Sequence, residues 1–244
     1  MLRLKKNICL CVFTYMKTTF LFNDLIDFLA PKVCLVSGEK IDSSSKFKYF
    51  NQKALDRIPL APGSQETRLR LRDKLNGELF IDEFICLYDI PENSEYMNLI
   101  YKLKYSGIKN IGIELGVLLG RKMIIEGYDQ NAVLIPVPLH KSKQRERTFN
   151  QSEIICKGIS SITGNKIITD SIKRTKYTIT QTKLGAVKRE RNVDGAFQLS
   201  KSFDHLSVII IDDVITTGST VNSIAKIIKE RYACKISAAS IGLA

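Results

Sequence analysis

The 244-residue sequence has no tryptophan, only two histidines, and no apolar run long enough to cross a membrane. A membrane-spanning helix needs roughly 18 or more consecutive apolar residues, so an integral membrane protein is not expected. The six cysteines form no CxxC pair and show no disulfide-framework spacing. We therefore expect no zinc site and reduced thiols, as in a cytoplasm. Internal repeats and low-complexity tracts are also absent, and the lack of tryptophan itself excludes nothing.

The composition is that of a soluble globular protein, with 44% hydrophobic and 25% charged residues. The length allows one large domain, or one domain with a small appendage. The net charge is +12 and is unevenly distributed: residues 141–191 hold thirteen Lys and Arg against four Asp and Glu, a net +9. Such a cluster suits a polyanion, either a pyrophosphate or a nucleic acid. A solvated basic face without a partner is the alternative.

The first fifteen residues have a basic start and a short apolar run, which superficially suggests a signal peptide. The run is brief, is followed by Lys17, and lacks an Ala-x-Ala cleavage site. We interpret it as a mis-assigned extension with Met16 as the true start. The expected location is cytoplasmic.

The most informative segment is VIIIDDVITTGST, residues 208–220. Its β-branched apolar start is typical of a central parallel strand, and Asp212 and Asp213 fall at the carboxyl end, where open α/β sheets bind ligands. A hydroxyl-rich turn with Gly218 then leads into residues at helical spacing. The start of that helix would offer free N–H groups to a phosphate. An exposed acidic turn followed by a plain N-cap is the alternative, but the complete series is hard to obtain by chance.

Strands and helices alternate along the chain, which predicts an α/β fold with a parallel sheet flanked by helices. The expected strands are 80–90, 132–137, 167–172, 207–212 and 235–242. The expected helices are 65–76, 97–105, 111–124, 149–162 and 219–231. We place a domain boundary near Pro91, which separates an N-terminal module (1–90) from an α/β domain (91–244). Residues 174–196 are basic, lack periodicity, and are expected to form a long functional loop.

A ribose phosphate has chemical needs that these residues meet. Adjacent carboxylates accept hydrogen bonds from the 2′- and 3′-hydroxyls, and residues 216–220 supply N–H and hydroxyl groups for the 5′-phosphate. A pyrophosphate at C1 would be neutralised by Mg²⁺ and basic side chains. Its departure leaves an oxocarbenium-like centre, so leaving-group stabilisation and water exclusion would carry most of the catalysis. A mobile basic loop fits that need.

Five segments resemble the ComF family of type I phosphoribosyltransferase-like proteins, which includes competence proteins. The match covers roughly residues 18–244. The segments are VIIIDDVITTGST, IPVPLHKSKQRERTFNQSE, the Arg174-Thr175 pair followed by residues 180–184, the residues Arg189, 191–193 and 195–197, and NLIYKLKYSGI. The resemblance implies a phosphoribosyltransferase-like fold with a small degenerate zinc-ribbon-like module before it. It also implies binding of phosphoribosyl pyrophosphate (PRPP) or a ribose 5-phosphate compound with Mg²⁺, in DNA uptake, natural competence or nucleotide metabolism.

The resemblance further implies roles for individual residues. Asp212 and Asp213 would hold the ribose, and together with Arg189 they would carry the chemistry. The other implied ligand-binding residues are Thr216, Thr217, Gly218, Ser219, Thr220, Pro138, His140, Lys141, Arg145, Arg147, Asn150, Gln151, Arg174, Gln181, Arg191 and Asn192. Helix capping by Asn150 and Gln151, a surface ion-pair network for the arginines, and a structural His140 remain alternatives.

Two departures from the family pattern bear on function. Thr148 stands where the family has glycine, which is awkward for a β-branched residue if φ is positive there. Cys34 remains from the zinc-ribbon cysteines without a partner pair, so we expect no zinc.

Two further hypotheses therefore stay open. One is a non-catalytic accessory that binds single-stranded nucleic acid together with DNA-uptake proteins. The other is a regulator that senses PRPP.

Overall fold

The computed structural model describes residues 31–42, 45–75, 77–91, 94, 96–140, 143, 147–175, 195–201 and 207–244. The chain divides into two compact units, Met1–Arg57 and Ile58–Ala244. The first fifteen residues, interpreted above as an extension, lie outside the described ranges.

The described part of the first unit is a turn followed by the short helix α2 (Gln52–Leu55). An antiparallel bridge joins Val33 to Lys40 around a turn in which Gly38 has a φ of 72°. The Cys34 thiol is buried at this turn and accepts backbone N–H groups from Ser37 and Asn51. Among described residues, no group of three or more His, Cys, Asp or Glu lies close enough to hold a metal. The zinc-ribbon-like character of this unit stays a prediction.

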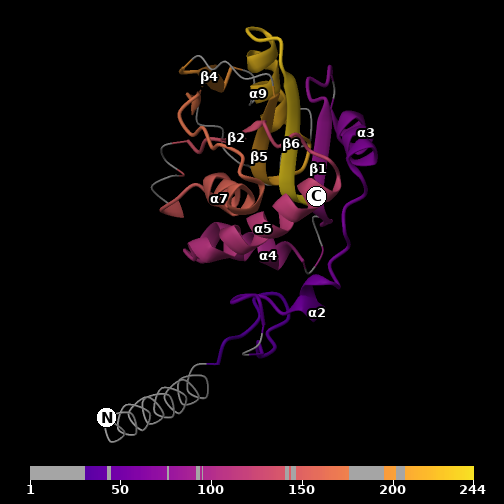
Figure 1. The fold of residues 1–244 in the computed structure, drawn as a ribbon, viewed down its shortest axis with the longest axis vertical. Helices are drawn as coiled ribbons and strands as arrows, with labels where there is room; N and C mark the ends of the chain where they lie inside the picture. The colour runs from indigo at the N-terminus through magenta and orange to yellow at the C-terminus, as the bar shows by residue number, and fades with distance from the viewer. Residues whose placement is uncertain are drawn as a thin grey trace, which may run out of the picture. The chain divides into compact units, whose positions relative to one another are not determined.

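The second unit is built on a four-stranded sheet in the order β1-β6-β5-β2 (Figure 1). Its strands are β1 (Glu83–Asp89), β2 (Val133–Pro136), β5 (Ser207–Ile215) and β6 (Lys235–Leu243). All three neighbouring pairs are parallel. The expected α/β class with a parallel sheet is therefore confirmed, and the strand that carries the acidic pair lies between two partners.

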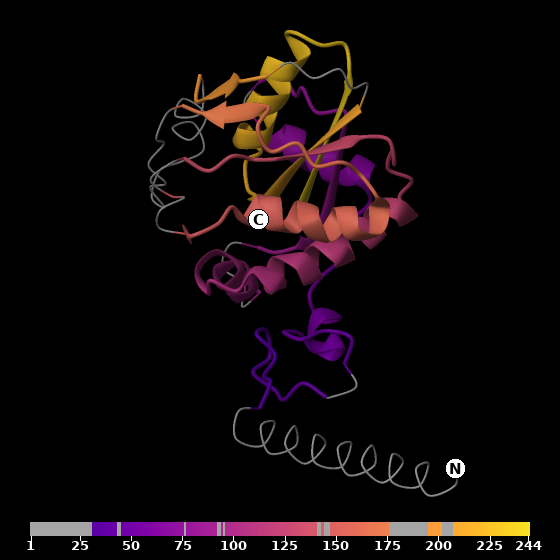
Figure 2. The same cartoon turned by 60° about the vertical axis from the view of Figure 1, so that its left-hand side comes forward.

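Helices cover both faces of this sheet (Figures 1 and 2). On one face α5 (Lys109–Ile125) packs against α7 (Gln151–Thr163), and α4 (Met97–Tyr105) packs on α5. On the other face, α3 (Ser64–Lys74) and α9 (Ser219–Lys229) contribute to one shared hydrophobic core. No described helix has the length and apolar character needed to span a membrane.

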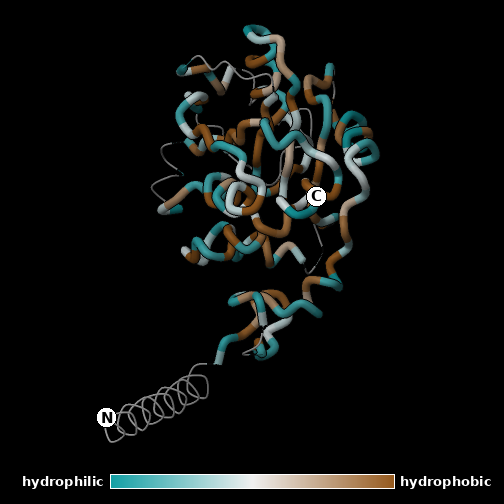
Figure 3. The backbone as a smooth tube through the Cα atoms, in the orientation of Figure 1, coloured by the Kyte–Doolittle hydropathy of each residue, from teal (hydrophilic) through white to brown (hydrophobic). Residues whose placement is uncertain are grey.

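Strand β5 shows why these layers form. Val208 and Ile210 face the core that α9 fills with Val221 and Ile224, and the alternate residues of the strand point to the opposite face. All four residues from 208 to 211 are at most 1% exposed. Burial on both faces explains the continuous β-branched run in the sequence. Figure 3 shows the same pattern, with hydrophobic strands inside and hydrophilic segments outside.

A second, two-stranded antiparallel sheet is made by β3 (Ile172–Arg174) and β4 (Phe197–Leu199). The expected strand 167–172 is thus partly wrong. Ile167 forms only an isolated bridge with Leu134, and the strand proper begins at Ile172. Most of the basic loop expected at 174–196 falls outside the described residues.

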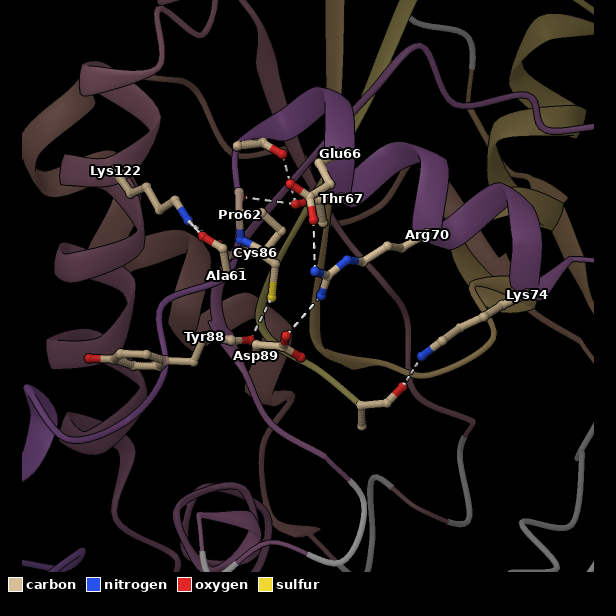
Figure 4. Close-up of polar contacts among 12 residues, drawn as sticks. Ala61, Pro62, Glu66, Thr67, Arg70, Lys74, Cys86, Tyr88, Asp89 and Lys122 are labelled. Carbon is tan, nitrogen blue, oxygen red and sulfur yellow. Dashed lines mark hydrogen bonds and ion pairs between the residues drawn. The ribbon is translucent and has the colours of Figure 1, made fainter.

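The predicted boundary near Pro91 is not where the structure divides the chain, because residues from Ile58 onward belong to the second unit. Strand β1 pairs with β6. Side-chain hydrogen bonds hold the segment before β1 to the rest of the second unit (Figure 4). Lys122 donates to the carbonyl oxygens of Ala61 and Cys86, both at 2.7 Å. Arg70 of α3 bonds Asp89 at 2.9 Å. The turn-rich sequence gave no sign of these long-range contacts.

Helices α5 and α7 cross with their backbones in contact. A Cβ placed on Gly116 would lie 2.3 Å from the carbonyl oxygen of Ile155, and one on Gly158 would lie 2.3 Å from that of Ile113. Only glycine permits this approach at both positions. The close crossing fixes the start of α7 against the sheet, and that start carries part of the site described next.

Candidate functional site

The acidic pair lies near the carboxyl end of β5, the strand paired with β2 and β6. Asp212 is opposite Ser240 of β6, and the strand continues to Ile215, beyond the end expected from the sequence. The turn after β2 reaches the same edge, because Pro136 pairs with Ile211 and the strands are parallel. The carboxylates therefore open toward the loops that follow β2 and β5.

Each carboxylate is oriented by hydrogen bonds. Asp212 Oδ1 accepts from the backbone N–H of Asp213 at 2.8 Å and from the hydroxyl of Ser152 at 3.2 Å. Asp213 Oδ1 accepts from the N–H of Val214 at 2.7 Å. Both hydrogen bonds to Asp212 fall on one oxygen. The pair is thus held in a fixed orientation by β5 and by the first turn of α7.

Basic side chains gather around the pair. Lys104 Nζ lies 3.3 Å from Asp213 Oδ1, and an Arg147 guanidinium nitrogen lies 3.9 Å from Asp213 Oδ2. Burial, followed by the charges of Arg147, Arg174 and Lys104, lowers the pKa of Lys143, while Asp213 opposes that shift. Four cations therefore surround two carboxylates. This excess suits a ligand that brings negative charge of its own.

Burial, and then the charge of Asp213, raise the pKa of Asp212 to about 7. An aspartate in an unfolded chain titrates near ~3.9. Between these two values the folded protein holds a proton that the unfolded chain has lost. The stability contribution of Asp212 is therefore complete below about pH 4, falls as the pH rises to about 7, and is level above that.

We expect Asp212→Asn to remove this dependence of stability on pH. The neutral side-chain oxygen can still accept from Ser152 and from the N–H of Asp213, but no buried charge has to form. At pH 8 the variant should be more stable than the wild type by on the order of 4 kcal/mol, and at pH 4 the two should be nearly equal. Urea unfolding of both proteins without Mg²⁺ at several pH values measures this. Parallel stability–pH curves would contradict it.

The turn after β5 contains Gly218 in the left-handed backbone conformation. Gly218 has a φ of 75° and precedes α9 as its N-cap residue. The hydroxyls of Thr217 and Ser219 lie 2.8 Å apart. Thr216 and Thr220 flank them, and the first turn of α9 presents N–H groups that the helix itself does not use. The hydroxyl and N–H groups from Thr216 to Thr220 are thus suited to binding an anion at the start of a helix.

The start of α7 ties the β2 turn to the basic residues. Asn150 is the N-cap, since its side chain accepts from the N–H of Ser152, and it also donates to the carbonyl of Val137 at 3.0 Å. The capping alternative therefore describes Asn150. Buried Gln151 instead donates to the Lys104 carbonyl at 3.2 Å and accepts from Arg147 at 3.4 Å. Both residues position other groups.

The remaining described residues of the implied set lie around this edge. Pro138 and His140 follow β2 and are half-buried. Arg174 ends β3, where its guanidinium lies 5.3 Å from the Phe197 ring centre. Burial lowers the pKa of Arg174, and the charge of Asp212 opposes that shift. Six implied residues lie outside the described ranges: Lys141, Arg145, Gln181, Arg189, Arg191 and Asn192.

Thr148 has a φ of 62° and is the one non-glycine residue with positive φ in the described part of the chain. The position therefore does require the left-handed conformation for which glycine is suited. The Thr148 hydroxyl donates to the carbonyl of Arg147. The strain sits directly beside a basic residue of the site.

Three site residues were missed in the sequence: Lys104, Lys143 and Ser152. Lys104 lies 109 residues before its partner Asp213, and only the fold brings the end of α4 to the end of β5. Lys143 lies in the quoted segment IPVPLHKSKQRERTFNQSE but was not singled out from the other basic residues there. Ser152 follows Asn150 and Gln151 directly. Its position in the first turn of a helix that was expected to lie near the acidic pair could have indicated that it belongs to the site.

Comparison with known proteins finds a similar domain and similar proteins. A model described as the phosphoribosyl transferase domain matches residues 158–242, from α7 to β6. "DNA utilization protein YhgH" of Salmonella typhimurium is 32% identical over 142 residues, which are 57% of this chain and 63% of that protein. "Competence protein F" of Haemophilus influenzae is 38% identical over 100 residues, 40% of this chain and 44% of that protein. "Competence protein ComFC" of Bacillus subtilis is 27% identical over 104 residues, 42% and 40% respectively.

The chain thus spans less than two thirds of the length of each of these relatives. The matched domain contains the acidic pair, the turn that follows it and α9, while Lys104 and β1 lie before it. The parallel sheet, the domain match and the three relatives together support a phosphoribosyltransferase-like protein of the ComF family.

Proposed function

We propose that the protein binds PRPP or a related ribose 5-phosphate compound at the carboxyl end of β5. The observation that carries this proposal is the acidic pair, half-buried Asp212 and buried Asp213, flanked by an excess of cations and followed by a glycine turn at a helix start. Asp212 and Asp213 accept from the ribose hydroxyls, and residues 216–220 contact the 5′-phosphate. Lys104, Lys143, Arg147 and Arg174 would neutralise the pyrophosphate.

A magnesium ion fits this donor set. Carboxylate and phosphate oxygens are the ligands that Mg²⁺ prefers, and it is commonly held by one or two carboxylates plus substrate phosphates. Asp212 and Asp213 are the candidate protein ligands, and bound Mg²⁺ would offset the charge of the leaving pyrophosphate. Lys104 and Arg147, which contact Asp213 in this structure, are close enough to turn toward the phosphates instead.

The relatives' printed names supply the biological setting. Because two are competence proteins and one is a DNA utilization protein, we propose that this protein acts in the uptake or use of DNA. Transfer of the phosphoribosyl group to an acceptor would make it an enzyme, and Arg189 is the proposed catalytic residue of the basic segment. Binding without transfer would make it a PRPP sensor.

Calorimetric titration with PRPP and Mg²⁺ tests the binding site. The wild type should bind. Asp212→Asn/Asp213→Asn should bind at least tenfold more weakly, because two charge-assisted hydrogen bonds to the ribose are weakened. Asp170→Asn is a matched control, since Asp170 is exposed and pairs with Lys201 in the other sheet region. Absence of wild-type binding, or equal binding by the double variant, would reject the site. Release of pyrophosphate with a panel of free bases separates transfer from sensing.

A further inference from the structure

The carboxylate of Asp213 is already neutralised by basic side chains of the same chain. Lys104 Nζ lies 3.3 Å from Asp213 Oδ1, and an Arg147 guanidinium nitrogen lies 3.9 Å from Asp213 Oδ2, so each oxygen faces one cation. Oδ1 also accepts the backbone N–H of Val214. The side chains of Asp213 and Lys104 are only 10% and 24% exposed, so little water screens their contact. A metal ion that approaches Asp213 therefore meets a carboxylate that two cations already hold.

The two cations differ in how firmly they are held. Arg147 is fixed by a hydrogen bond to Gln151 at 3.4 Å and by the Tyr105 ring, whose centre lies 5.4 Å from the guanidinium. The backbone of Lys104 is fixed as well, because its carbonyl accepts from the Gln151 side chain. The Lys104 amine, in contrast, lies at the end of a flexible four-carbon stem. It can leave the carboxylate by side-chain rotation alone.

The charge around the acidic pair opposes binding of a bare cation. Lys104 and Arg147 contact Asp213, and Lys143 and Arg174 lie near enough to act on the pair electrostatically. Positive charge is therefore in excess even when both carboxylates are ionised, and a lone divalent cation is repelled. A pyrophosphate reverses this balance, because it offers the Lys104 amine another anion and supplies further oxygen ligands for Mg²⁺.

We propose that Lys104 determines which metal ions and ligands the acidic pair accepts. Its amine occupies Asp213 in the free protein and excludes a divalent cation that arrives alone. A pyrophosphate group draws the amine away and frees Asp213 for the ribose and for Mg²⁺. The site therefore accepts PRPP and discriminates against ribose 5-phosphate, which has no pyrophosphate to engage Lys104. This inference rests on the proposed function for the identity of the ligand, but not for the exclusion of a lone cation.

Binding of Mn²⁺ to the full chain tests the exclusion without any organic ligand. Mn²⁺ takes the same kinds of oxygen ligand as Mg²⁺, and electron paramagnetic resonance measures its free concentration. The wild type should bind Mn²⁺ alone only weakly. Lys104→Met keeps most of the apolar stem without the charge and should bind Mn²⁺ about tenfold more tightly than the wild type. Lys104→Arg keeps the charge and should stay within about threefold of the wild type.

Two controls locate the effect at Asp213. Lys102→Met removes an exposed lysine from the same helix and should leave the Mn²⁺ affinity unchanged, which excludes a general effect of net charge. Lys104→Met/Asp213→Asn should lose the gain, because the carboxylate that Lys104 had occupied is no longer present. Wild-type Mn²⁺ affinity in Lys104→Met would overturn the proposal. So would an equal gain in Lys102→Met, in Lys104→Arg or in the double variant.

Calorimetric titrations with PRPP and with ribose 5-phosphate, both with Mg²⁺, test the choice of ligand. Lys104→Met should bind PRPP more weakly and ribose 5-phosphate at least as tightly as the wild type, so the ratio of the two affinities should fall about tenfold. An unchanged ratio would contradict the role of Lys104 in ligand choice.

The two readouts keep this inference separate from the proposed function. If the wild type does not bind PRPP, the proposed function fails, whereas a gain of Mn²⁺ affinity in Lys104→Met would still identify Lys104 as the excluding cation. Wild-type PRPP binding without any such gain would reject the inference and leave the proposed function standing.

Discussion

Gly158→Ala should destabilise the second unit by about 3 kcal/mol and lower its midpoint of thermal unfolding by about 10 °C. The new Cβ would lie 2.3 Å from the carbonyl oxygen of Ile113 and 2.8 Å from the Cα of Gly116. Both are backbone atoms of α5, so no side-chain rotation can relieve the overlap. Helices α5 and α7 have to move apart, which loosens contacts along their whole crossing.

Circular dichroism during heating measures this effect. Gly77→Ala is the matched control, because a Cβ at Gly77 meets nothing within 4 Å, and it should leave the midpoint nearly unchanged. Since α7 also carries Ser152 and Gln151, Gly158→Ala should weaken PRPP binding at temperatures where the protein is still folded. A midpoint within about 2 °C of wild type would mean that the two backbones are not as close as described.

Gly218→Ala should weaken PRPP binding by about 100-fold and destabilise the protein by about 2 kcal/mol. Gly218 has a φ of 75°, a conformation that costs an L-residue roughly 1–2 kcal/mol. The added Cβ would also lie 2.2 Å from Cδ1 of Leu71, a side chain with no exposed surface. The turn that would hold the 5′-phosphate has to shift in response, and its N–H groups lose their alignment.

A second substitution separates the two causes. In Gly218→Ala/Leu71→Ala the clash is gone while the backbone strain remains. If crowding by Leu71 displaces the turn, this double variant should bind PRPP better than Gly218→Ala does. The single variant Leu71→Ala measures how much the cavity left by Leu71 destabilises the protein. This cost has to be subtracted from the destabilisation of the double variant. Wild-type affinity and stability in Gly218→Ala would contradict the role given to this turn.

The sequence predicted most elements of the second unit because their patterns are strong. Residues 208–211 are apolar without interruption, as a strand buried on both faces requires, and α9 has apolar residues at helical spacing. Asp212, Asp213 and Gly218 were found for the same reason, since strand, turn and helix follow one another directly. Local order along the chain was enough for this half of the site.

The other half could not be predicted because it depends on contacts between distant segments. Lys104 reaches Asp213 only after α4 has packed on α5, and although it lies in the segment NLIYKLKYSGI, nothing there marks it as a partner of the acidic pair. The predicted domain boundary near Pro91 differs from the division at Arg57 for a similar reason. The charged helix expected at residues 65–76 was assigned to the N-terminal module, yet Leu71 of α3 lies under Gly218 and α3 belongs to the same core as α9.

The pairing of β1 with β6 has a consequence for synthesis of the protein. Glu83 and Ser237 are 154 residues apart yet lie in neighbouring strands. While the chain is being translated, β1 emerges early and has no partner strand until β6 has left the ribosome. During that interval its apolar residues Phe84, Ile85 and Leu87 are available to other chains and to chaperones. We therefore expect the nascent chain to depend on chaperones for longer than a protein whose strands pair in order.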